Sequence, residues 1–115
     1  TVGENSFRDV TTIMTGNGEA GKYNNQISSG TVANCNGVEV VTFAHASPTT
    51  ISTFSGVVPN KLYSFQFTNG NTTIDRSNAW LDGGTNKTGS ANDVMMVLGV
   101  TSSTIRQAAP ISTNA

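Results

Sequence analysis

The chain has 115 residues and a formal net charge of −1 at pH 7, from six Lys or Arg and seven Asp or Glu residues. This length suits a single domain. The charges are scattered, so the sequence has no basic surface of the kind that binds nucleic acid or anionic membranes. No apolar run approaches the roughly 18 residues of a membrane-spanning helix. The chain starts at Thr1 without a charged and then apolar leader, so we expect it to be cut or processed from a longer protein.

The composition favours a β protein that is rich in turns. Thr, Asn, Ser and Gly make up almost half of the chain, whereas Ile, Leu, Val and Phe together make up less than a quarter. So few large apolar side chains predict a thin core, and a chain of this kind gains stability by burying surface against copies of itself. Intrinsic disorder is disfavoured because it is usually accompanied by a high net charge.

Cysteine and histidine each occur once, as Cys35 and His45. An intrachain disulfide is therefore impossible, and a zinc site would need more such ligands than the chain offers. We expect Cys35 to be a small buried side chain. The sequence predicts no metal site and no cofactor.

The first third of the chain gives weak strand signals. Residues 6–14 indicate one short strand, and residues 15–36 are rich in Gly and Asn, with a strand predicted near residues 26–33. Residues 38–44 are β-branched and apolar on both faces, as in a buried strand. Residues 49–54 form the next predicted strand after Pro48.

The clearest alternation follows in residues 61–67, where Tyr63, Phe65 and Phe67 fall on one face of a strand. The Asn69-Gly70 pair comes directly after it. Both residues tolerate the positive φ of a two-residue type I′ turn, so the pair predicts a tight hairpin with residues 71–74.

The last third carries the longest apolar run. Residues 79–81 indicate a short strand, residues 82–92 a loop, and residues 93–100 a buried strand. Residues 101–103 form a turn before a strand at residues 104–107. The tail from Ala108 is expected to fray or to lie over a neighbouring molecule.

Taken together, seven or eight short strands at regular intervals predict an all-β fold, specifically a small antiparallel β-sandwich or jelly-roll-like domain. The tripeptide Thr-Thr-Ile occurs at residues 11–13, 49–51 and 72–74. Because the spacings are unequal, we interpret this recurrence as composition bias and not as a solenoid repeat.

Many short stretches occur in an order that resembles a known family. They are residues 40–46, residues 48–54 with Gly56, residues 62–74, residues 79–84 and residues 88–98. In this order they are similar to a module near the C-terminal ends of bacteriophage tailspikes that carry a pectate-lyase-like β-helix. The family often ends in an aromatic-rich strand, and residues 102–109 lack aromatic side chains.

The resemblance implies a location, a partner and a division of the chain. It implies a homotrimeric virion fibre that acts outside the host cell on bacterial surface polysaccharide, with the catalytic groove in an N-terminal β-helix outside this chain. Residues 1–36 are then a less regular segment that continues from such a β-helix, residues 37–107 the sandwich module, and residues 108–115 a tail.

Trimer formation is also expected from the apolar pattern. Residues 38–43 and 94–100 are apolar on both faces, so the second face of each strand needs a cover. A neighbouring copy around a threefold axis would supply it. The alternative is that residues 15–36 of the same chain cover that face.

Candidate functional residues are few. His45 follows a strand and suits a turn position better than catalysis, and the seven acidic residues form no pair with the spacing of a glycosidase. We therefore expect a chain without enzymatic activity. Trp80, Asp82 and Asn86 form a weak candidate ligand-binding set, with an aromatic platform and a polar rim. Packing of Trp80 in the core is the favoured alternative. A free-standing carbohydrate-binding module or lectin is the competing function.

Overall fold

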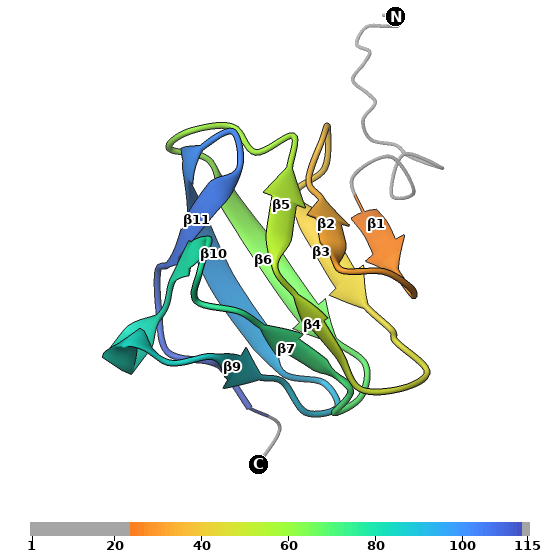
Figure 1. The fold of residues 1–115 in the computed structure, drawn as a ribbon. Helices are drawn as coiled ribbons and strands as arrows, with labels where there is room; N and C mark the ends of the chain where they lie inside the picture. The colour runs from red at the N-terminus through yellow and green to blue at the C-terminus, as the bar shows by residue number, and fades with distance from the viewer. Residues whose placement is uncertain (1–23, 114–115) are drawn as a thin grey trace, which may run out of the picture.

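The computed structural model describes residues 24–113, and within that range it is all-β with no α-helix (Figure 1). The strands are β1 (Asn24–Ile27), β2 (Val32–Asn34), β3 (Val40–Phe43), β4 (Thr49–Ile51), β5 (Thr53–Ser55), β6 (Leu62–Phe67), β7 (Thr72–Ile74), β8 (Ala79–Trp80), β9 (Lys87–Thr88), β10 (Val94–Thr101) and β11 (Thr104–Gln107), and a 3-10 turn, η2, spans Asp82–Gly84. None of the helical structure in this range is long and apolar enough to cross a membrane. The strand predicted at residues 6–14 lies outside the described residues.

Three sheets enclose the core. The main sheet has six strands in the order β1-β3-β6-β10-β11-β8, and the smaller sheets have the orders β2-β5 and β4-β7-β9. In Figure 1 the two smaller sheets lie in front of the main sheet. The predicted all-β class is therefore confirmed.

The chain winds through these sheets in successive turns. β3 lies in the main sheet, β4 and β5 lie in the smaller sheets, and β6 then returns to the main sheet parallel to β3. Val40 pairs with Ser64 of the next turn, and Thr49 pairs with Thr72 at a nearly equal separation along the chain. Among the strands of residues 24–113, five of the eight pairings are parallel. The sheets are thus mixed and stacked like a solenoid, which corrects the predicted antiparallel sandwich.

The predicted hairpin at Asn69-Gly70 is wrong. β7 pairs with β4 and β9 and not with β6, and neither Asn69 nor Gly70 has a positive φ. The Asn69 side-chain oxygen instead accepts a hydrogen bond from the Asn71 N–H at 2.9 Å. The side-chain amides of both asparagines donate to the His45 carbonyl at 2.9 Å. Residues 69–71 therefore form a corner of the chain, which contacts the corner at His45 in the preceding turn.

The Thr-Thr-Ile recurrence is a structural repeat at two of its three positions. Residues 49–51 and 72–74 pair residue for residue, with Ile51 beside Ile74 and both fully buried. Their interpretation as composition bias is therefore wrong. Residues 11–13 lie outside the described residues.

Two predicted strands are each divided by a corner. Residues 26–33 contain the end of β1 and the start of β2, and residues 49–54 are interrupted at Ser52. β1 pairs with β3, and β2 pairs with β5. Strands that precede the predicted boundary between residues 36 and 37 thus pair with strands that follow it.

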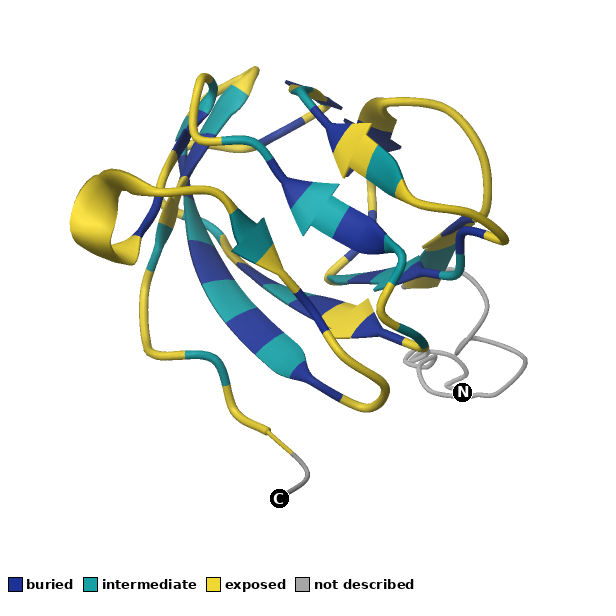
Figure 2. Cartoon of the chain, turned by 60° about the horizontal axis from the view of Figure 1, so that its bottom comes forward, coloured by how far each residue is buried: buried dark blue, intermediate teal, exposed yellow. Residues whose placement is uncertain are grey.

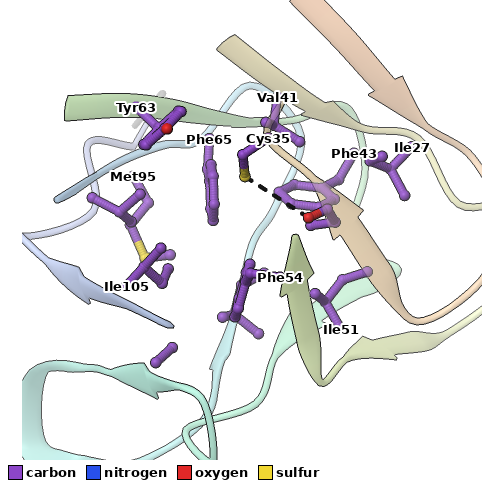
Figure 3. Packing of buried hydrophobic residues seen from close by; sticks show 14 of the residues in the cluster. Ile27, Cys35, Val41, Phe43, Ile51, Phe54, Tyr63, Phe65, Met95 and Ile105 are labelled. Atoms are coloured by element: carbon purple, nitrogen blue, oxygen red, sulfur yellow. Dashed lines mark hydrogen bonds between the residues drawn. The ribbon is translucent and has the colours of Figure 1, made fainter. Parts of the chain in front are cut away.

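The core forms where the inward side chains of the main sheet meet those of the smaller sheets (Figure 3). Tyr63, Phe65 and Phe67 are buried on one face of β6, as predicted. The Phe65 ring lies 5.2 Å from the Phe43 ring and 6.0 Å from the Phe54 ring, measured between centroids. These aromatic side chains therefore supply much of the buried apolar surface that the few aliphatic side chains cannot.

β10 and β11 close the stack with an antiparallel hairpin. β10 pairs antiparallel with β6 on one side and with β11 on the other. The chain after β11 stays on β10, because the Ser112 N–H and carbonyl bond to Val94 at 2.9 and 3.0 Å, respectively. The tail from Ala108 was expected to fray or to lie over a neighbouring molecule, and fraying is wrong up to Ser112.

We predict that replacing Gly99 destabilises the fold. A Cβ there would overlap the Val58 carbonyl oxygen and lie 2.8 Å from Val57 Cγ1. Gly99→Ala should lower the free energy of unfolding by about 1–3 kcal/mol, the range for overpacking a core. Gly70→Ala is the matched control, because its Cβ would lie 3.8 Å from the Gly89 oxygen. Denaturant unfolding of both variants checks this, and equal midpoints would contradict the packing described.

Candidate functional site

Trp80 lies on the molecular surface and not in the core. It is 58% exposed, whereas its neighbours Ala79 and Leu81 are 1% and 7% exposed. These two buried neighbours fix the register of the short strand β8, so the indole points outward. The interpretation of Trp80 as a core residue is wrong.

The nearest charged partner of Trp80 comes from a distant part of the sequence. Arg106 on β11 pairs directly with Trp80 in a parallel ladder. The guanidinium carbon lies 5.7 Å from the centroid of the indole ring, in the geometry of a cation–π contact. No local sequence signal points to this pair, because only the sheet topology brings β8 beside β11.

The other two candidate residues lie on the turn after β8. Asp82 is exposed in η2, and its backbone N–H donates to the Gln107 side-chain oxygen at 2.9 Å. Asn86 is also exposed, but its side-chain oxygen accepts the Arg76 N–H at 3.0 Å and so supports a different turn. Asp82 is close to Trp80 in the sequence, whereas the side-chain oxygen of Asn86 is bonded to the backbone of Arg76.

The outer face of the main sheet carries an apolar patch. Leu62 on β6 is 54% exposed and pairs directly with Leu98 on β10. Ser64, the next outward residue of β6, lies between Val40 and Met96. The side chains of Val40, Met96 and Leu98 are only half buried. We call Val40, Leu62, Met96 and Leu98 the outer patch. Figure 2 shows the alternation of buried and half-buried residues along β10.

His45 is buried and its ring nitrogens are both engaged. Nδ1 lies 2.7 Å from the Thr72 hydroxyl, and Nε2 lies 3.1 Å from the Gly30 carbonyl oxygen. Because a carbonyl only accepts, Nε2 donates to Gly30, and the Thr72 hydroxyl is the hydrogen-bond partner of Nδ1. Gly30, His45 and Thr72 belong to three successive turns, so this histidine joins the turns.

Two acidic side chains in the described part, Asp75 and Asp93, have turn-stabilising contacts. Asp93 is buried and accepts the Ser90 N–H at 2.9 Å, and Asp75 accepts the Ser77 N–H at 2.9 Å. Within residues 24–113 no three His, Cys, Asp or Glu side chains lie close enough together to hold a metal ion. These contacts match the ordinary role of Asp in turns.

Comparisons with protein-family models, curated proteins and solved structures give no match for this chain. The resemblance to tailspike modules therefore rests on the sequence stretches alone.

Cys35 is fully buried, and its thiol lies 3.8 Å from the Ala33 carbonyl oxygen (Figure 3). Burial raises the pKa of the thiol to about 11, although the charge of Lys61 opposes the shift. At pH 8 only about one thiol in a thousand would then be ionised, and the thiolate is the reactive form.

We predict that Cys35 resists thiol reagents in the folded protein. Its modification at pH 8 should be roughly 100-fold or more slower than in guanidinium chloride, where the thiol is exposed and has an ordinary pKa. An aromatic disulfide reagent releases an absorbing aromatic thiol when it reacts with cysteine, so the absorbance measures the modification rate in both conditions. Similar rates in the two conditions would show that Cys35 is accessible in the folded chain.

Proposed function

We propose that this chain is a non-catalytic trimerisation and receptor-presenting domain from the C-terminal region of a bacteriophage tailspike that acts on bacterial surface polysaccharide. Its place would be the virion, and its action extracellular. The observation that supports the proposal is the outer patch, where Leu62 is exposed and Val40, Met96 and Leu98 are half buried on one face of the main sheet.

The outer patch suits contact with a second copy of the chain. Large exposed apolar areas mark interaction surfaces, and the four side chains of the patch carry no charge. Within the described residues, β1 extends the main sheet sideways and β2 belongs to another sheet, so residues 24–36 do not supply the cover. A net charge of −1 gives little repulsion between copies. Three copies around an axis could each bury the same patch.

The stacked turns are consistent with a continuation toward the N-terminal side. β1 pairs only with β3 among the described strands, so its other backbone edge can accept a further parallel strand. A β-helix that precedes the domain would provide such a strand. At the opposite end, the antiparallel hairpin of β10 and β11 ends the repeating pattern, as a terminal cap does in a solenoid.

The absence of catalysis is part of the proposal. The single histidine is buried with both ring nitrogens bonded, and the bonded carboxylates of Asp75 and Asp93 hold turns. Glycoside hydrolysis needs two carboxylates that face one bond of the sugar. In the proposed spike, that chemistry belongs to another part of the chain.

A free-standing carbohydrate-binding module is the second candidate, and exposed Trp80 favours it. Such a module would bind sugar as a single chain. Assembly therefore distinguishes the two candidates, because only the fibre domain requires a trimer for its function.

We predict a homotrimer that depends on Leu62. Sedimentation equilibrium at micromolar concentration should give three times the 12.0 kDa chain mass. Leu62→Lys should shift the population to monomer, because a charge buried in the proposed interface loses its hydration. Thr50→Lys, at an exposed residue of the three-stranded sheet, is the control and should remain trimeric. A wild-type mass of one chain, or an unchanged trimer with Leu62→Lys, would contradict this interface.

A further inference from the structure

We infer that Trp80, Arg106 and Asp82 form a binding site for a neutral hexose unit of an oligosaccharide, at the edge of the main sheet. This inference rests on the proposed function and deepens it by naming the residues that face the sugar. It replaces the grouping of Trp80 with Asn86, because the structure pairs the indole with Arg106.

The site begins with an aromatic platform that the fold holds in place. β8 is the last strand of the main sheet, so β11 flanks it on one side and no described strand flanks it on the other. Arg106 approaches the indole from β11, and 58% of Trp80 remains exposed. The buried side chains of Ala79 and Leu81 anchor the strand on either side of the indole. An exposed ring that is already fixed loses little conformational freedom on binding.

Gln107 bonds to the backbone of the turn that carries Asp82. Its side-chain oxygen accepts the Asp82 N–H at 2.9 Å, and its side-chain amide donates to the Ala109 carbonyl at 2.9 Å. Gln107 is the chain neighbour of Arg106, so the bond from Asp82 ties the turn that carries Asp82 to the strand that carries Arg106. The backbone of the turn that carries Asp82 is thus fixed to the strand whose residue Arg106 contacts the indole.

The three groups match the chemistry of a pyranose ring. The apolar C–H face of a sugar packs on an aromatic ring, while its hydroxyls both donate and accept hydrogen bonds. Asp82 accepts from hydroxyls, and Arg106 donates to them. The opposite charges of Asp82 and Arg106 leave the set without a net charge, so it suits a neutral hexose. Nucleic acid is disfavoured because the chain carries no excess of positive charge.

One aromatic side chain binds a sugar weakly, and assembly into a trimer would increase the overall affinity for a polysaccharide. Leu62 pairs with Leu98, Leu98 with Arg106, and Arg106 with Trp80, so Trp80 lies in the same cross-strand row as the two leucines. If the outer patch forms the interface, the indole lies toward its rim, where it stays open to a ligand. Three such sites on one trimer would bind a repeating polysaccharide with higher avidity than one site.

The test uses the fluorescence of the only tryptophan in the chain. The full chain is titrated with neutral hexose oligosaccharides, including gluco-, galacto- and manno-oligosaccharides, and with polygalacturonate as the acidic comparison. We expect a saturable change in Trp80 emission with at least one neutral oligosaccharide and none with polygalacturonate. Saturation-transfer NMR should detect the same binding independently of the tryptophan.

Variants separate this site from general surface binding. Trp80→Ala should weaken binding in the NMR measurement by roughly tenfold or more, as expected for the central aromatic residue of a site. Asp82→Asn should weaken it less. Val58→Ala is the matched control, since Val58 is 50% exposed in another part of the chain. Circular dichroism confirms that each variant is folded.

Two results would overturn the inference: no neutral oligosaccharide changes the emission, or binding survives in Trp80→Ala. Sedimentation of the same samples keeps the proposed function separate. A trimer that binds no sugar would remove the sugar site and leave the assembly role, whereas a monomer that binds sugar through Trp80 would keep the site and remove the trimer.

Discussion

The structure depends on the stacking of each turn of the chain directly on the turn before it, with parallel strands in register. Val41 pairs with Phe65 and Phe43 pairs with Phe67, so like side chains meet inside the stack. The Phe43 and Phe67 rings lie 5.3 Å apart in a stacked arrangement. A chain with few aliphatic residues obtains a continuous core in this way, because buried aromatic rings contact apolar residues of the adjacent turn.

The same register determines the outer face of the main sheet. Because side chains alternate along a strand, placing Phe65 inside places Ser64 and Gln66 outside, and it leaves Leu62 on the surface. The main sheet then presents an apolar strip over its centre and the Trp80–Arg106 pair at its edge. The proposed assembly surface and the proposed sugar site are therefore two parts of one face that the core packing fixes.

The sequence predicts the strands better than it predicts their partners. Local alternation identifies β6, and a continuous apolar run identifies β10, since both patterns are properties of neighbouring residues. It does not separate a hairpin from a corner between stacked turns. The Asn69-Gly70 pair suits both, and the contact that decides between them is with His45, in the preceding turn of the chain. The recurrence of Thr-Thr-Ile carried the pairing information, but the unequal spacing obscured it.

The candidate site was predicted in part for the same reason. Trp80 and Asp82 are close in the sequence, so a local pattern could group them. Arg106 could not be found this way, because it reaches the indole through a parallel ladder between strands that are far apart in the sequence. Asn86 shares the polar loop with Asp82, but its side chain bonds to the backbone of Arg76.

Disulfide trapping tests the stacking of turns most directly. Thr50 and Thr73 pair in register on β4 and β7, so cysteines at these positions should form an intrachain disulfide on mild oxidation. The experiment uses a Cys35→Ala background, with mass spectrometry to identify the linked peptides. Thr50→Cys with Thr88→Cys is the control, because β9 lies beyond β7 and those residues are two strands apart, roughly 9–10 Å. The stacked turns predict a crosslink in the first pair alone. Free thiols in the first pair, or equal crosslinking in both, would contradict the register on which the fold and both proposed surfaces depend.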